Sequence, residues 1–325
     1  MYVGAIAQDA PRMGNFQQPL RSLACTHVLS HHPRVKRHPL LPFALTVGVL
    51  SISTAAVFIK LCIQDGAAAS VIAAARMGIA AAVIVPLALA VRGRRVFAIP
   101  RDCVRPVLLS GLFLGAHFFF WITSLSCTSV LSSVVIVTTN PIFVGLASIL
   151  FLKERLHWQL VVGILLAAAG GGVIALLDKG GAPGSLYGDL MSLGGAVMMS
   201  CYLLVGRRIR ARIDVWSYVA IVYSVAAVFL IGIAAFSGDR VLSYQPRTYV
   251  LFLLLALVPQ VIGHSALNWA LGHATATIIA VCILGEPIAT CVIAYMFLGE
   301  RFTMTQSLGG VLILGGILVS LRRQA

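Results

Sequence analysis

The sequence predicts an all-α integral membrane protein with ten transmembrane helices in two inverted five-helix repeats. Three observations lead to this prediction: the composition, the number of long apolar runs and a pattern that occurs twice. Apolar residues make up 59% of the 325 residues and charged residues only 10%, against about 25% charged residues in a typical soluble domain. Because the charges cluster between long uncharged stretches, lipid is the expected main solvent.

Ten apolar runs are long enough to cross a bilayer, which requires about 20 residues. They cover residues 41–64, 67–91, 104–124, 127–151, 158–177, 185–206, 215–236, 248–271, 274–298 and 303–321. Some turns between them are only a few residues long, as at Asp65-Gly66. Merging two runs would give a helix of about 45–50 residues, far too long for one bilayer. Each short turn is therefore interpreted as a tight hairpin.

The repeated pattern recurs at an offset of 146 positions. Its two copies are Asn140-Pro141 followed by Lys153-Glu154-Arg155, and Glu286-Pro287 followed by Gly299-Glu300-Arg301. This offset maps the fourth run onto the ninth and the fifth onto the tenth. Each repeat then contains an odd number of helices, so the second enters the membrane upside down relative to the first. Inverted repeats are typical of secondary transporters.

The lysine and arginine residues indicate the orientation. With the N-terminus inside, 18 of the 24 lie in inner segments and only 4 in outer loops, as the positive-inside rule predicts. Both termini are therefore expected in the cytoplasm, with the protein in the inner or plasma membrane. We expect a polar basic tail at residues 1–40, a first repeat at 41–177 and a second at 178–325. The same rule accounts for the net charge of +14, so no nucleic-acid partner is expected.

These patterns resemble the EamA family of the drug/metabolite transporter superfamily. The resemblance depends on the prolines of the fourth and ninth runs, Pro141 and Pro287, and on the Glu-Arg pair that follows each. Further similar stretches are Ala74-Ala75-Arg76, Tyr187-Gly188-Asp189-Leu190 and Asn268-Trp269-Ala270-Leu271. The resemblance covers about residues 41–321. It implies a ten-helix exporter of amino acids and related metabolites.

Two charged residues lie deep within apolar runs, where a charge costs about 3 kcal/mol on insertion scales. Glu286 directly precedes Pro287, whose missing N–H frees a carbonyl one turn earlier. Glu286 could bind a substrate ammonium group, carry a coupling proton or pair permanently with an arginine. Arg76 lies too deep to snorkel comfortably. It could receive a substrate carboxylate, but a structural role beside Glu286 or a helix-end carbonyl is favoured.

Less polar side chains complete the predicted binding or coupling site. They are Asn140, His117, His264, Gln260, Asn268 and Trp269. Asn140 is the repeat counterpart of Glu286, so the two halves of a central cavity would differ in charge. The histidines lie in corresponding helices and could relay protons or simply pack. Amides suit a zwitterion and an aromatic ring suits an ammonium group, whereas Trp121 and its neighbouring phenylalanines are interpreted as packing or lipid-facing residues.

The remaining motifs are interpreted structurally. Glu154-Arg155 and Glu300-Arg301 lie at helix ends on opposite membrane faces, where they would fix the helix ends or close a gate. Three groups of glycines predict small surfaces for close helix packing. They are Gly111 with Gly115, Gly170-Gly171-Gly172 and Gly315-Gly316.

The predicted function is secondary transport of small polar organic metabolites by alternating access, and an amino-acid exporter is the preferred form. The sequence lacks the P-loop pattern G-x-x-x-x-G-K-[ST], so ion or substrate gradients would drive transport. Transport of other metabolites or cationic drugs is the alternative. A lipid-modifying membrane enzyme and a receptor subunit are disfavoured, and no metal or cofactor is expected. The expected partners are the substrate and the bilayer, and the oligomeric state stays open, a monomer included.

Overall fold

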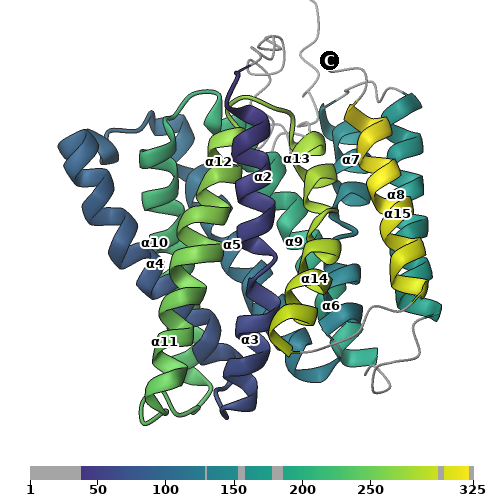
Figure 1. The fold of residues 1–325 in the computed structure, drawn as a ribbon. Coiled ribbons are helices and arrows are strands. Elements are labelled where there is room, and N and C mark those ends of the chain that lie inside the picture. The colour runs from purple at the N-terminus through teal and green to yellow at the C-terminus, as the bar shows by residue number, and fades with distance from the viewer. Residues whose placement is uncertain (1–37, 129, 153–157, 178–185, 299–303, 322–325) are drawn as a thin grey trace, which may run out of the picture. The chain divides into compact units, whose positions relative to one another are not determined.

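The computed structural model describes residues 38–128, 130–152, 158–177, 186–298 and 304–321, which all belong to one compact unit. Within these ranges every regular element is a helix (Figure 1), as predicted. The helices are α2 (Leu41–Ile52), α3 (Ala55–Gln64), α4 (Ala69–Arg92), η1 (Gly93–Phe97), α5 (Arg101–Cys127), α6 (Val130–Val137), α7 (Asn140–Leu152), α8 (Trp158–Leu177), α9 (Leu186–Arg210), α10 (Val215–Phe236), α11 (Pro246–Leu255), η2 (Ala256–His264), α12 (Ser265–Ala270), α13 (Ala276–Ile283), α14 (Glu286–Leu298) and α15 (Met304–Leu321).

Seven helical segments among the described residues are long and apolar enough to span a membrane. They are Leu41–Gln64, Ala69–Phe97, Arg101–Cys127, Leu186–Arg210, Val215–Phe236, Pro246–Ala270 and Ala276–Ile293. Two shorter apolar helical stretches cover Ser133–Ala147 and Val161–Gly170. The chain is therefore a multi-pass helical membrane protein.

Several of the expected continuous helices are interrupted. A turn at Ser53 and Thr54 separates α2 from α3, and a turn at Thr138 and Thr139 separates α6 from α7. In both turns the hydroxyl groups donate to carbonyl oxygens three or four residues earlier, at 2.7 to 2.8 Å. Such local hydrogen bonds compete with the backbone ladder and bend or end a helix. Hydroxyl-rich pairs inside apolar runs thus divide two helices into halves.

Proline completes the interruptions in the repeated motif. Pro141 is the second residue of α7 and Pro287 the second residue of α14. Proline is favoured at the first helical positions because a backbone N–H there would have no intrahelical acceptor, so its absence costs no hydrogen bond. The turn at Leu284 and Gly285 plays the same part before α14 as Thr139 does before α7. The two prolines therefore mark the start of a second half-helix rather than a kink inside a continuous one.

Pro259 lies in a different kind of irregularity. Between α11 and α12 the chain forms a π-helix, η2, over Ala256–His264. A proline removes one backbone donor and clashes with the preceding turn, and a widened π-turn is one way to absorb this. Because π-turns are frequent at functional sites, the two polar residues that η2 carries, Gln260 and His264, are of particular interest.

Glycines bring the central helices close together. A Cβ on Gly111 would lie 2.6 Å from Val225 Cβ, and one on Gly115 would lie 2.7 Å from Phe229 Cδ1. Both contacts join α5 to α10 and confirm the packing surface predicted at these two glycines, whereas a Cβ on Gly172 or Gly315 would meet nothing within 4 Å. A Cβ on Gly263 would likewise lie 2.8 Å from Ile52 Cγ2, so η2 packs directly on α2. These contacts set the rotation of each helix about its axis.

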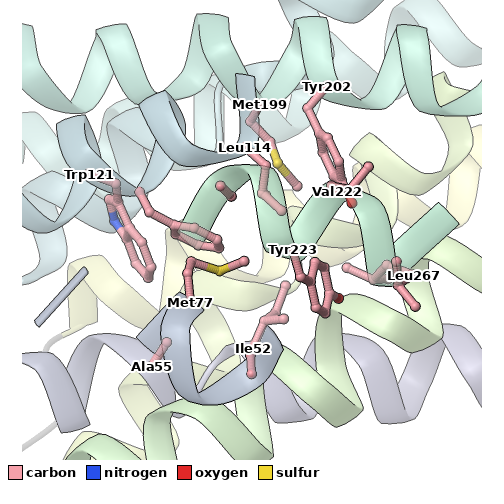
Figure 2. Close-up of a cluster of buried hydrophobic side chains, with 14 of the residues drawn as sticks. Ile52, Ala55, Met77, Leu114, Trp121, Met199, Tyr202, Val222, Tyr223 and Leu267 are labelled. Atoms are coloured by element: carbon pink, nitrogen blue, oxygen red, sulfur yellow. The ribbon is translucent and has the colours of Figure 1, made fainter. Parts of the chain in front are cut away.

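The helices pack in pairs. At one edge of the bundle α8 lies along α15, and towards the other edge α4 packs on α10 (Figure 1). Between these pairs, α5 packs on α9, and α2 packs on η2 and α12. Figure 2 shows part of the buried core, with Met77 and Leu114 between Trp121 on one side and Tyr223 on the other. Polar groups that would be costly in lipid are thus enclosed by protein.

Candidate functional site

A small buried cavity lies beside the helix interruptions. Its lining residues are Ile52, Ala55, Arg76, His117, Trp121, Val137, Thr138, Asn140, Met199, His264, Ile283 and Glu286. Its volume is about 20 Å³, against roughly 10–15 Å³ for one water molecule. Ligand pockets of known proteins measure about 300–1,000 Å³. The cavity therefore represents a contracted space that must expand before it holds an organic molecule.

The interruptions place the polar lining. Asn140 begins α7 and Glu286 begins α14, each directly after a turn. The interruption of the first helix also contributes, because the Ser53 carbonyl accepts a hydrogen bond of 3.0 Å from Thr290 Oγ1 on α14. The Asn140 carbonyl accepts one of 3.1 Å from Ser200 Oγ on α9. Neighbouring helices thus satisfy the backbone groups that the interruptions release, as a membrane interior requires.

Arg76, on α4, is fully buried and is held from two sides. Its Nε donates to Gln260 Oε1 at 2.9 Å, and its Cζ lies 4.0 Å from the centroid of the Phe118 ring. The terminal nitrogens Nη1 and Nη2 have no hydrogen-bond partner among the described residues. The guanidinium is therefore clamped at its inner nitrogen while its two outer nitrogens stay available.

Glu286 lines the same cavity and is 6% exposed. The ion pairs found in the described part of the chain are Arg92–Asp214, Arg212–Asp102 and Arg247–Asp65. Arg76 and Glu286 thus approach one cavity without a direct ion pair within 4.0 Å. The sequence favours a structural role for Arg76 beside Glu286 or a helix-end carbonyl, but among the described residues its hydrogen-bond partner is Gln260.

The two predicted histidines, which lie in corresponding helices one position out of the repeat register, both line the cavity. His117 Nδ1 donates to the Gly195 carbonyl at 2.9 Å, which leaves Nε2 as an acceptor in the neutral ring. The His264 ring packs edge-on against Phe118, with centroids 5.3 Å apart. One histidine is therefore oriented by a backbone hydrogen bond and the other by an aromatic contact.

Three predicted residues lie outside the cavity lining. Gln260 reaches the site only through Arg76. Asn268 accepts a hydrogen bond of 2.5 Å from Tyr202 and donates one of 3.4 Å to Tyr223, so its amide belongs to a tyrosine cluster. The Trp269 ring lies 4.1 Å from the His273 ring. The pairs Glu154-Arg155 and Glu300-Arg301 lie outside the described residues.

Trp121 is the main residue that the sequence interpretation missed. It is buried, lines the cavity and stacks on His117 with centroids 5.9 Å apart. Its indole Nε1 has no hydrogen-bond partner within the described ranges. Its position four residues after His117 places the two on one helical face, and this spacing was the available signal. Thr138 and Met199 also line the cavity, and no motif marked them.

A larger hollow of about 830 Å³ lies elsewhere, between α4, α5 and α10. Its lining is mostly apolar, and its polar residues include Ser70 and Asp239, which form a hydrogen bond of 2.5 Å with each other. None of the predicted binding residues lines it. Because specificity requires a few placed polar groups, the small polar cavity is the better candidate despite its size.

Comparisons with known proteins agree with this architecture. The model of the EamA-like transporter family matches residues 41–176 and 186–322. An uncharacterized transporter of Archaeoglobus fulgidus is 24% identical over 66% of this chain and 74% of its own length. A protein of Escherichia coli named "Probable amino-acid metabolite efflux pump" is 27% identical over 51% of this chain and 59% of its own length.

A solved structure, titled only "Crystal structure of protein", has a TM-score of 0.72 with 19% identity. The match covers 89% of this chain and 99% of that chain, and it supports the fold alone. The sequence relatives are named as transporters and not as enzymes, in line with the prediction of a non-enzymatic protein. Since the family model matches both halves, this chain belongs to the EamA-like transporter family and is a membrane transporter.

Proposed function

We propose that this protein is a secondary exporter of small polar organic metabolites of the amino-acid type, working by alternating access around the small buried cavity. In this proposal the chain has a tail at residues 1–40 and five spans in each of the segments 41–177 and 178–325. The two segments are inverted repeats in the inner or plasma membrane, and both termini face the cytoplasm.

The observation that carries the proposal is the cavity itself. It is enclosed by protein, lies beside interruptions in several helices and contains one buried cationic and one buried acidic side chain. Transporters place substrate sites near discontinuous helices at a repeat interface. Because the cavity holds about one water molecule, passage of a metabolite requires the surrounding helices to move apart.

The pattern of helix packing supports inverted repeats. Consider a rotation that exchanges each span of the first half with the corresponding span of the second half. The packed pair α4 and α10 then maps onto itself, and so does the packed pair α8 and α15. The same exchange maps the packing of α5 on α9 onto that of α2 and α3 on η2, α11 and α12. It also maps the contact of α7 with α13 onto that of α6 with α14. A two-fold relation between the halves accounts for all of these pairings.

The charge distribution supports the orientation. Arg92 pairs with Asp214 at 3.3 Å, and Arg212 pairs with Asp102. These contacts place the basic clusters after α4 and α9 at the same end of the bundle. Positive charge at one end is expected on the cytoplasmic side.

Opposite charges suit a molecule that carries both an amine and an acid. Glu286 would attract an ammonium group and is the proposed coupling group, while Asn140 and the two histidines supply further hydrogen-bonding groups. The buried carboxylate by itself favours the second candidate, a transporter of cationic metabolites or drugs. The two candidates differ in whether the substrate needs an acidic group.

Flux in proteoliposomes tests the proposal. A panel of labelled amino acids is followed with and without a pH gradient, for wild type, Glu286→Gln and a matched carboxyl-to-amide change at Asp239 (Asp239→Asn), which lies outside the small cavity. We expect saturable flux of one amino-acid class, with gradient dependence lost in Glu286→Gln only. Gradient dependence that survives in Glu286→Gln would refute the coupling role. Flux of amines without flux of any amino acid would favour the second candidate.

A further inference from the structure

Most of the buried polar side-chain atoms that lack a partner in the described part of the chain gather at one place. The full set of these unpartnered atoms in the described part of the chain is Arg76 Nη1 and Nη2, Trp121 Nε1, Asn140 Oδ1 and Nδ2, Gln260 Nε2 and Gln159 Oε1. Arg76, Trp121 and Asn140 all line the small cavity. Each of the three is at most 3% exposed. Because an unsatisfied buried polar group is costly, such a cluster requires a physical reason.

Apart from the acceptor oxygen of Asn140, the unpartnered side-chain atoms that line the cavity are hydrogen-bond donors, as an anion site requires. The guanidinium and the indole offer N–H donors only, and the amide nitrogen of Asn140 adds a further donor. Arg76 Nε is occupied by Gln260, so the free nitrogens are the two at the end of the fork. These two can form the parallel, bidentate pair of hydrogen bonds that a carboxylate accepts.

The surroundings hold the arginine in place. The Phe118 ring lies 4.0 Å from Arg76 Cζ, and the Trp121 ring lies 5.9 Å from it. Gln260 is carried by the π-helix, whose irregular geometry brings its amide to the guanidinium. A fork that is fixed in advance loses little side-chain entropy when it binds its acceptor.

We propose that Arg76, Trp121 and Asn140 form the subsite that binds the carboxylate of the transported molecule. This inference rests on the proposed function and narrows it: the substrate must carry a free carboxylate, whatever its other end. The carboxylate accepts hydrogen bonds from the unpartnered nitrogens when the cavity expands. Glu286 then faces the opposite end of the molecule, and the second candidate, a purely cationic substrate, is disfavoured.

The first test measures selectivity in proteoliposomes. Each of the twenty proteinogenic amino acids that shows saturable counterflow is compared with its methyl ester and its decarboxylated amine. Wild type should prefer the free acid at least about tenfold, as expected for loss of a charged partner at a buried site. Arg76→Lys, Trp121→Phe and Asn140→Leu should lose this preference, whereas the exposed Trp158→Phe should keep it. Equal transport of acid and ester by wild type would overturn the proposal.

The second test needs no transport and separates the subsite from the wider proposal. The thermal unfolding midpoint of the full chain in nanodiscs is measured in sodium propionate and in sodium chloride at equal ionic strength. Propionate should raise the midpoint of wild type and of Arg94→Met, an exposed control, but not that of Asn140→Leu. Absence of any propionate shift in wild type would refute the carboxylate subsite, even if amino acids are transported. A propionate shift without amino-acid transport would instead retain the subsite and reject the amino-acid class.

The same measurement distinguishes a ligand site from a structural one. Asn140→Leu replaces an unpartnered amide with an apolar group of similar size, so without ligand its midpoint should equal or exceed that of wild type. A midpoint more than a few degrees below wild type in Asn140→Leu would mean that the amide stabilises the fold. That result would contradict its assignment to substrate.

Discussion

The contact of Gly111 with α10 allows a quantitative prediction for Gly111→Ala. The added Cβ would lie 2.6 Å from Val225 Cβ and 3.0 Å from the Val222 carbonyl oxygen, whereas carbon atoms in favourable contact are about 3.5–4.0 Å apart. Because a backbone atom is among the obstacles, α5 must move away from α10 by about 1 Å. Overpacking of this kind costs about 1–3 kcal/mol. Since α5 also carries His117 and Trp121, the shift reaches the cavity wall.

The assay compares thermal unfolding midpoints and initial transport rates in lipid. At about 2–4 °C per kcal/mol, Gly111→Ala should lower the midpoint by roughly 2–12 °C and reduce transport. Gly232→Ala on α10 is the matched control, because a Cβ there meets nothing within 4 Å. The control should raise the midpoint slightly, since alanine is favoured over glycine in a helix by about 0.5–1 kcal/mol. Equal midpoints for the two variants would refute the close-packing argument.

Three further predictions concern the site, a helix cap and the topology. Gln260→Met should lower the unfolding free energy by about 1–3 kcal/mol because Arg76 Nε loses its acceptor. Adding Arg76→Met to this variant should recover part of that loss. Strictly additive effects of the two substitutions would contradict the contact. Asp214 caps α10, and although partial burial opposes it, hydrogen bonds from Ser217 hold the pKa of this carboxyl below its usual value. The stability that this cap contributes is therefore present above the unfolded pKa of about 4 and is lost as the pH falls through the lower folded pKa. Asp214→Ala should lower the unfolding free energy by about 1 kcal/mol at neutral pH and by less in acid. An equal loss at both pH values would exclude the charged cap. A tag inserted after Ser243 should be labelled from outside intact cells and one after Arg94 only after permeabilisation, and the reverse result would overturn the orientation.

Several parts of the candidate site could be predicted because they depend on local pattern. The repeat offset pairs Asn140 with Glu286, the two histidines lie in corresponding helices one position out of that register, and all four residues line one cavity. The proline motifs indicated where helices are interrupted, since a missing N–H acts within one turn of its own position. Burial of a charge in an apolar run was equally visible in the sequence, as at Arg76.

Other parts could not be predicted because they depend on how separate helices face one another. Asn268 and Trp269 have suitable chemistry, but the amide contacts Tyr202 and the indole contacts His273. The sequence favours packing or lipid contact for Trp121, yet this residue lines the cavity, and its indole nitrogen has no partner among the described residues. Gln260 reaches Arg76 from a π-helix, whose altered register shifts side chains away from the positions that a regular helix would give them.

The membrane class, the family and the twofold pattern follow from composition, spacing and offset, because the length of an apolar run and the position of a proline are properties of the chain itself. The partners of the buried polar groups were decided only by the tertiary structure. Close contacts at glycines such as Gly111 and Gly263 set the rotation of each helix. That rotation brings Arg76, Trp121 and Asn140 to one cavity, although they lie on three different helices.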